Sequence, residues 1–190
     1  MKAMSKRYAI GAAAAAAVLA GSLASGAASP ASAGTPTQSR VASVVVQQVT
    51  LRLASEPGQV ANVRGASKEN LAPVIQWPWS GAANERWEPE AAGGGYYRFK
   101  SVSSGKCLNV EGGGSADGAR VIQYTCGSAA NELWKLVPKG IGYQIVVKVS
   151  GKCLNVRGGT GQGNSLIQYT CVVGGAPNDV WLPVWEEPLR

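Results

Sequence analysis

The stretch 103–134, SSGKCLNVEGGGSADGARVIQYTCGSAANELW, decides the fold because a close copy of it follows at 150–181, SGKCLNVRGGTGQGNSLIQYTCVVGGAPNDVW. A third, diverged copy comes first, GQVANVRGASKENLAPVIQWPWSGAANERW at 58–87. It keeps the Asn-Val, Val-Ile-Gln-Trp and Asn-Glu-x-Trp segments in the same order. The steps from Val60 to Cys107 and from Cys107 to Cys153 are 47 and 46 residues, a period typical of repeat architectures. The sequence therefore predicts three copies of one structural unit.

The first 33 residues have the pattern of a secretory signal peptide. A basic opening precedes an alanine-rich apolar run, and the small residues Ala31, Ser32 and Ala33 form an A-x-A cleavage site. Glycines and serines interrupt the run, which argues against a membrane anchor, and no cysteine follows directly to carry a lipid. We expect a secreted protein with a flexible lead-in at 34–46 and no membrane attachment of the mature form.

The positive charge of the chain lies partly in this leader. The formal net charge of the 190 residues is +7, and it falls to +4 when the leader's three cations, Lys2, Lys6 and Arg7, are left out. The Lys and Arg residues of the remainder are scattered singly, whereas a nucleic-acid-binding face needs clustered positive charge. We therefore expect no nucleic-acid partner, and the remaining length suits one domain.

Strand signals recur just upstream of the repeated motifs. The runs 44–53 (VVVQQVTLRL), 96–102 (YYRFKSV) and 143–149 (YQIVVKV) are rich in β-branched and aromatic residues. Glycine-rich connections separate them, and no window after the leader shows a sustained helical period. Many short strands in three copies predict a closed or sandwiched all-β fold with pseudo-threefold symmetry.

The cysteines fall inside the second and third copies, one pair in each. Four cysteines allow three connectivities, and the equivalence of the two copies favours a bond within each repeat. The first copy has Val60 and Trp79 at these positions, so both partners of a bond are missing together. Each bond closes a loop of about twenty residues and contributes about 3 kcal/mol in the chain-entropy treatment. The predicted disulfides are Cys107–Cys126 and Cys153–Cys171.

Catalytic chemistry finds little support in the sequence. The chain has no histidine, which excludes Ser-His-Asp and Cys-His arrangements and His-ligated metals, and it has no CxxC motif. Two carboxylate pairs occur once each at the edges of repeats, and we interpret them as solvated surface charge. We expect no catalytic residues, no enzyme activity, no metal and no cofactor. The two pairs are Glu88 with Glu90, and Glu186 with Glu187.

The ordered motifs carry a family resemblance. SGKCLNV, a glycine-rich turn, Ile-Gln-Tyr-Thr-Cys and Asn-acid-x-Trp resemble the ricin B-chain type lectin repeat, also found in family-13 carbohydrate-binding modules of secreted bacterial enzymes. The resemblance covers about 47–185 and implies an all-β fold, the β-trefoil, in a domain at 47–190. Its repeats would span about 47–93, 94–139 and 140–185. It also implies binding of glycans or polysaccharide through up to three shallow sites, one per repeat, and we expect the protein to be a monomer.

The resemblance assigns three site residues to each copy. Family members use a polar residue after Cys-Leu, an aromatic platform just before the second cysteine, and the asparagine of the last motif. The apolar face of a pyranose lies on such a ring while polar groups fix its hydroxyls. The final tryptophans, Trp87, Trp134 and Trp181, match core residues of the family. The matched site residues are Asn62, Trp77 and Asn84 in the first copy, Asn109, Tyr124 and Asn131 in the second, and Asn155, Tyr169 and Asn178 in the third.

Two positions depart from the family pattern in every copy. The family's aspartate is Asn62, Asn109 or Asn155, and the glutamine of its Gln-x-Trp motif is Glu85, Glu132 or Asp179. Because both positions change, we predict that the hydrogen bond between them survives with its polarity reversed, so that the acid supports the pocket. Losing the anionic acceptor costs each site about tenfold in affinity, which several weak sites could offset on a polymer.

A second hypothesis stays open at this point. A degenerate trefoil that has lost sugar binding could act as a protein-interaction module, for example as a protease inhibitor, by analogy with other trefoil families. Under the lectin hypothesis we expect the second copy to hold the best-formed site. It keeps the disulfide and the ring, whereas the first copy lacks the cystine that would hold its loop.

Overall fold

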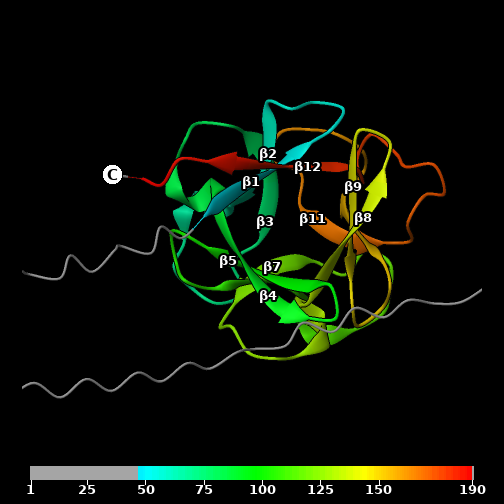
Figure 1. The fold of residues 1–190 in the computed structure, drawn as a ribbon, viewed down its shortest axis with the longest axis horizontal. Helices are drawn as coiled ribbons and strands as arrows, with labels where there is room; N and C mark the ends of the chain where they lie inside the picture. Colours follow the sequence, from blue (N-terminus) through cyan, green and yellow to red (C-terminus); the bar gives the residue numbers. More distant parts are fainter. Residues whose placement is uncertain (1–46, 190) are drawn as a thin grey trace, which may run out of the picture. The chain divides into compact units, whose positions relative to one another are not determined.

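The computed structural model describes residues 47–189 (Figure 1), and the predicted signal peptide and lead-in fall outside them. This part of the chain forms twelve strands, four per repeat. The strand signals at 96–102 and 143–149 are confirmed as β5 and β9, and 44–53 contains β1. The strands are β1 (Gln48–Leu53), β2 (Gln59–Val63), β3 (Val74–Pro78), β4 (Trp87–Gly93), β5 (Tyr96–Ser101), β6 (Cys107–Val110), β7 (Val121–Tyr124), β8 (Trp134–Lys139), β9 (Gly142–Val147), β10 (Cys153–Val156), β11 (Leu166–Tyr169) and β12 (Trp181–Glu186).

Antiparallel pairing closes six of these strands into a barrel. The ring runs β1, β4, β5, β8, β9 and β12, and β12 returns to β1 along six paired positions. Figure 1 shows β12, in red, beside β1. Closure leaves these six strands without an unpaired edge. Each repeat contributes its first and fourth strands to the barrel.

The second and third strands of each repeat form a hairpin beside the barrel. The hairpins β2–β3, β6–β7 and β10–β11 attach to β1, β5 and β9. Isolated bridges join each hairpin to the other two, at Pro73 with Ile122, Ile75 with Ser165, and Arg120 with Ile167. A six-stranded barrel capped by three hairpins is a β-trefoil, so the predicted fold is confirmed.

Short 3₁₀ turns connect the strands on the hairpin side. They are η1 (Arg64–Ala66), η2 (Ala83–Glu85), η3 (Glu111–Gly113) and η4 (Ala130–Glu132). Within residues 47–189 no helix is long and apolar enough to cross a bilayer.

The final tryptophan of each copy belongs to the core, as predicted. Trp87, Trp134 and Trp181 have no exposed surface. Their indole N–H groups donate to the carbonyls of Ala61 (3.1 Å), Leu108 (2.9 Å) and Leu154 (2.9 Å). Burying a tryptophan requires a partner for its N–H, and the repeated motif supplies one from the same copy each time.

Both predicted disulfides, Cys107–Cys126 and Cys153–Cys171, are confirmed. In the first copy Trp79 takes the place of the second cysteine, and its ring centroid lies 4.9 Å from Arg52 Cζ and 5.3 Å from Arg86 Cζ. A guanidinium near an aromatic face is attracted by the ring quadrupole. The Trp79 N–H also donates to the Gly58 carbonyl (2.8 Å). Two cation–π contacts and a backbone bond therefore hold the loop that lacks a cystine.

Candidate functional site

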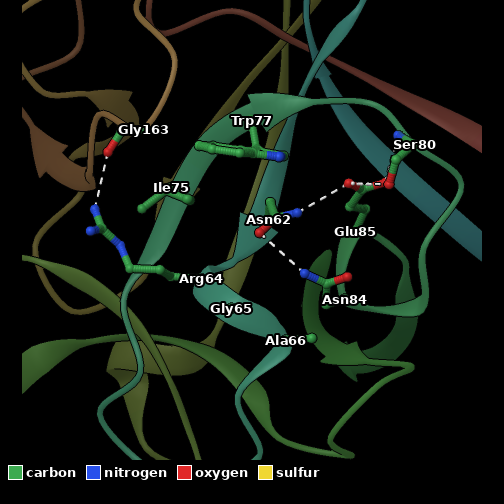
Figure 2. A pocket seen from close by; sticks show the side chains of 10 residues that line it. All are labelled: Asn62, Arg64, Gly65, Ala66, Ile75, Trp77, Ser80, Asn84, Glu85 and Gly163. Carbon is green, nitrogen blue, oxygen red and sulfur yellow. Dashed lines mark hydrogen bonds between the residues drawn. The ribbon is translucent and has the colours of Figure 1, made fainter.

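The first copy forms a pocket of about 520 Å³ that contains its predicted site residues. Asn62 comes from β2, Trp77 from β3, and Asn84 and Glu85 from η2. Figure 2 shows Trp77 on one side of Asn62, with Asn84 and Glu85 beyond it. Gly163, from the third repeat, completes the lining. The structure thus brings together four side chains that the sequence analysis had assigned to one site.

A directed chain of hydrogen bonds links the polar groups of this pocket (Figure 2). Asn62 donates through Nδ2 to Glu85 Oε1 (3.1 Å), so the predicted reversal of polarity is confirmed in this copy. Asn84 Nδ2 donates both to Asn62 Oδ1 (3.2 Å) and to the Val63 carbonyl (2.9 Å). One N–H of Asn62 and the Oδ1 of Asn84 have no partner among residues 47–189, so both remain for a ligand.

Glu85 also organises the loop between β3 and η2. Its side chain is buried and accepts from the N–H groups of Ser80 (2.9 Å), Gly81 (3.1 Å) and Ala82 (3.3 Å), and from Ser80 Oγ (2.9 Å). With Asn62, the carboxylate has five donors. Such a network holds a charged group in a buried position and fixes the loop around it.

The second copy forms a smaller pocket, of about 430 Å³, with the same groups. It is lined by Asn109, Tyr124, Asn131 and Glu132, and by Leu71 from the first repeat. Asn131 Nδ2 donates to Asn109 Oδ1 (2.9 Å) and to the Val110 carbonyl (2.9 Å). The two pockets therefore share a ring above a pair of side-chain amides.

The third copy repeats the amide pair. Asn178 Nδ2 donates to Asn155 Oδ1 (3.0 Å) and to the Val156 carbonyl (2.9 Å). Tyr169 ends β11 and lies diagonally across from Asn155 on the paired strands, since Cys153 faces Tyr169 and Asn155 faces Ile167. The three rings are well exposed for their size, at 39% for Trp77, 43% for Tyr124 and 46% for Tyr169.

The predicted bond between asparagine and acid is wrong for the second and third copies. Glu132 Oε1 accepts instead from the Gly127 N–H (2.8 Å). Asp179 accepts from the N–H groups of Val172 (3.1 Å) and Ala176 (2.6 Å), and from Gln144 Nε2 (3.0 Å). Aspartate is one methylene shorter than glutamate, and its two oxygens are occupied by these three donors. Among the described residues, the Nδ2 groups of Asn109 and Asn155 consequently have no acceptor.

The sequence analysis missed the contribution of neighbouring repeats. Gln123 donates to the carbonyls of Ser67 (2.9 Å) and Glu69 (2.8 Å) in the repeat before it. Gln168 binds the carbonyls of Gly114 and Ala116 in the same way (both 2.9 Å). These buried glutamines hold the loops that carry the outer walls of the pockets. The signal was a glutamine after Ile in every copy, a polar residue in an otherwise apolar strand.

Three of the four carboxylates in the predicted surface pairs, Glu88, Glu90 and Glu186, form ion pairs, and the Glu186 side chain is only 15% exposed. Lys100 Nζ lies 3.6 Å from Glu88 and 3.4 Å from Glu90, and Arg52 lies 2.7 Å from Glu186. Across residues 47–189 the structure gathers no group of three or more His, Cys, Asp and Glu side chains suited to a metal.

Comparison with known proteins agrees with the β-trefoil architecture. A family described as "Ricin-type beta-trefoil lectin domain-like" matches residues 37–124 and 90–169. A designed threefold-symmetric protein, ThreeFoil, is 37% identical with a TM-score of 0.69, over 72% of this chain and 97% of that one. The exo-β-1,3-galactanase 1,3Gal43A from Clostridium thermocellum is 31% identical with a TM-score of 0.67, over 74% of this chain and 30% of that one.

The fold extends to more distant proteins. The Rhizoctonia solani agglutinin superposes with a TM-score of 0.66 at 16% identity, over 76% of this chain and 99% of the agglutinin, which shows a common fold. No curated protein sequence matches significantly. The family match covers more than half of the chain, and the triplicated barrel has the expected architecture, so this chain belongs to the ricin-type β-trefoil lectin-like family.

Proposed function

We propose that this chain is a secreted, non-catalytic glycan-binding protein in which the pockets of Trp77 and Tyr124 each hold one sugar residue. The observation that carries the proposal is the recurrence of an exposed ring beside a hydrogen-bonded pair of asparagines, in separate copies and with the same contacts. If these rings served only to pack the core, they would be buried. They are instead exposed beside amide groups that lack partners.

The chemistry of the pockets suits a pyranose. The ring offers an apolar face to the C–H groups of the sugar, and the amides offer both donors and an acceptor to its hydroxyls. The volumes of about 520 and 430 Å³ lie in the range of small-ligand sites. Both pockets are open, so a sugar within a longer polymer could enter without a free chain end.

The similarity to the galactanase supports β-1,3-galactan as the first ligand to test, since the two chains are 31% identical over the matched region. Each pocket alone should bind weakly, because neutral amides replace the family's carboxylate. A polymer that reaches two pockets of one molecule would bind more tightly through effective concentration.

The test is a binding assay with the purified protein, β-1,3-galactan oligomers and a panel of soluble and insoluble polysaccharides. We expect Trp77→Ala and Tyr124→Ala each to weaken binding about tenfold, and the double variant to abolish it. Trp185→Ala is the matched control, because Trp185 is exposed but lines neither pocket.

Equal binding by the wild type and the double variant would remove these pockets from the function. Failure of the wild type to bind any glycan, together with inhibition of a secreted protease, would favour the protein-interaction hypothesis instead.

A further inference from the structure

The first pocket contains a cation that the family resemblance did not assign. Arg64 follows β2 in η1 and lines the pocket together with Trp77 and Gly163. We infer that this pocket selects an acidic sugar, a uronate whose carboxylate pairs with the Arg64 guanidinium while its ring lies on Trp77. The inference rests on the proposed function and names the class of sugar for one of its sites.

The position of Arg64 is fixed by the neighbouring repeat. Its Nη2 donates to the Gly163 carbonyl (3.1 Å), a contact that Figure 2 shows at the edge of the pocket. A Cβ added to Gly163 would lie 3.8 Å from Cζ3 of Trp77, so this anchor is next to the ring. A guanidinium has five N–H groups, and one is used here, so a planar fork remains for a carboxylate.

No acid within the described residues neutralises Arg64. The ion pairs found across residues 47–189 do not include it. Glu85 is the carboxylate that lines the pocket, but it is buried and saturated by five donors. The pocket floor therefore presents an N–H of Asn62, and its rim presents a positive charge.

The replacement of the family's aspartate points to the same class of ligand. A carboxylate at position 62 would accept hydroxyl hydrogens and would repel an acidic sugar a few ångströms away. Asn62 instead leaves an N–H that can donate to a ligand oxygen. The charge has moved from position 62 to Glu85, whose oxygens are occupied by five donors, so the group that faces a ligand beside Arg64 is an N–H donor that suits acceptors.

The other copies provide an internal comparison. Arg157 in the third copy donates to the Gly118 carbonyl (2.6 Å), the counterpart of the Arg64 contact. The second copy has Glu111 at this position, and Arg120 binds both of its oxygens (2.7 Å each). That pairing lowers the pKa of Glu111 and raises the pKa of Arg120, so both groups are charged at neutral pH. The second copy thus carries a neutralised pair where the first carries an unpaired cation.

The wall beside Arg64, which the neighbouring repeat supplies, also differs between the copies. Gly163, Gly118 and Leu71 occupy equivalent positions, because each donates its N–H to the carbonyl of the repeated glutamine, Gln76, Gln168 or Gln123. Leu71 gives the second pocket an exposed apolar wall, whereas Gly163 leaves the first pocket open beside the guanidinium. We therefore expect the preference for acidic sugars at the first pocket and not at the second.

The test compares two ligands that differ at C6, where one carries a carboxylate and the other a neutral hydroxymethyl group. Trigalacturonate and its carboxyl-reduced trimer have the same linkage and ring stereochemistry. Binding is followed by the NMR shift of the Trp77 indole N–H, which reports on the first pocket alone. We expect the acidic trimer to bind this pocket about tenfold more tightly at low salt, and the preference to shrink as ionic strength rises.

The variant Arg64→Gln should remove the preference, so that the acidic and the reduced trimer bind the first pocket with equal affinity. Arg64→Lys should keep part of it, because a lysine retains the charge without the fork. Arg157→Gln is the matched control and should not affect the Trp77 titration. A wild type without the preference, or an Arg64→Gln variant that keeps it, would overturn the inference.

The two proposals fail in distinguishable ways. If neither trimer shifts Trp77 while β-1,3-galactan does, the acidic-sugar inference is wrong and the glycan-binding function stands. If no glycan shifts Trp77 or binds at Tyr124, both proposals fall together.

Discussion

Restoring the family's residue pair in the first pocket should reveal a strong coupling between Asn62 and Glu85. The perturbation is a double-mutant cycle of Asn62→Asp, Glu85→Gln and the two together. Asn62→Asp places a carboxylate oxygen about 3.1 Å from Glu85 Oε1, a repulsion of about 5 kcal/mol at an effective dielectric constant of 20. Protonating the introduced carboxyl limits the cost at pH 7 to about 4 kcal/mol.

Glu85→Gln should also destabilise the protein when made alone. The five donors around Glu85 need two acceptor oxygens, and a glutamine supplies one oxygen and one NH₂ group. Turning the Asn62 amide to accept would place its Nδ2 against Asn84 Nδ2, which is also fixed by the Val63 carbonyl. At least one buried donor is left without a partner, at a cost of about 2 to 3 kcal/mol.

The double variant removes both conflicts. The introduced carboxylate accepts from the introduced amide and still accepts from Asn84, so its stability should lie within about 1 kcal/mol of the wild type. The coupling energy is then about 5 kcal/mol, measured by urea denaturation at pH 7 with the disulfides intact. The new anionic acceptor should also raise the affinity for neutral sugars about tenfold.

Two further results could refute this reasoning. The carboxyl introduced by Asn62→Asp has a raised pKa, so its penalty applies at high pH and should shrink as the pH falls toward 5. Asn109→Asp is the matched control in the second copy, where Asn109 makes no bond to Glu132, and it should cost less than half as much. Additive costs in the cycle, or a pH-independent penalty for Asn62→Asp, would contradict the account.

Three other predictions concern the loops around the pockets. The double variant Val60→Cys/Trp79→Cys should form a third disulfide, because Val60 faces Trp77 as Cys107 faces Tyr124. Peptide mapping without reduction should find the bond. The oxidised variant should be about 3 kcal/mol more stable than the Val60→Ser/Trp79→Ser control. Leu71 has a φ of 68°, which glycine adopts without strain, so Leu71→Gly should raise the free energy of unfolding by about 0.5 kcal/mol. Because Leu71 lines the second pocket, the same variant should bind glycan there more weakly. Unchanged binding would show that Leu71 does not belong to the site. Arg120 lowers the pKa of Glu111 below 4.5, so their pairing stabilises the fold above that pH and is lost as the pH falls. Glu111→Gln should therefore flatten the decline of Tm between pH 5 and 3. An equal decline of Tm in the variant and the wild type would contradict this.

The repeated motif was sufficient to predict a triplicated all-β fold and its disulfides, and its resemblance to the ricin B-chain repeat predicted the β-trefoil. The positions of Cys107 and Cys126 recur at Cys153 and Cys171, and equivalent copies in one barrel place equivalent residues in the same geometry. The final tryptophans were predictable for the same reason, since each must enter the core at the start of the fourth strand of its repeat. The three copies can be aligned with one another, so a single chain shows which positions recur and are structurally equivalent.

The details of the sites depend on loops that differ between copies. Glu132 keeps the bond to the Gly127 N–H that matches the bond of Glu85 to the Ser80 N–H, but it makes none to Asn109. The motif is the same in both copies, so sequence spacing does not predict this difference. The Arg52 and Arg86 contacts to Trp79 could not be predicted either, because both arginines lie outside the aligned cysteine positions, and Arg52 reaches the ring through the pairing of β1 with β2.

The walls supplied by neighbouring repeats were missed for a related reason. Leu71 and Gly163 belong to the loops between the hairpin strands, the most variable part of each copy, and they line the pocket of the next repeat in the ring. A repeat considered alone contains the ring and the amides of its site. It does not contain the wall that distinguishes one site from another.

The central claim is that the ring and amide pockets bind the glycan. Its most direct test is an NMR titration of the protein with a glycan that it binds. Site binding predicts that the Trp77 indole N–H and the side-chain amides of Asn62 and Asn109 shift together with sugar concentration. The indole signals of the buried Trp87 and Trp134 should stay unchanged. Saturable binding that leaves Trp77, Asn62 and Asn109 unshifted would show that the ring and amide pockets are not where this protein meets its ligand.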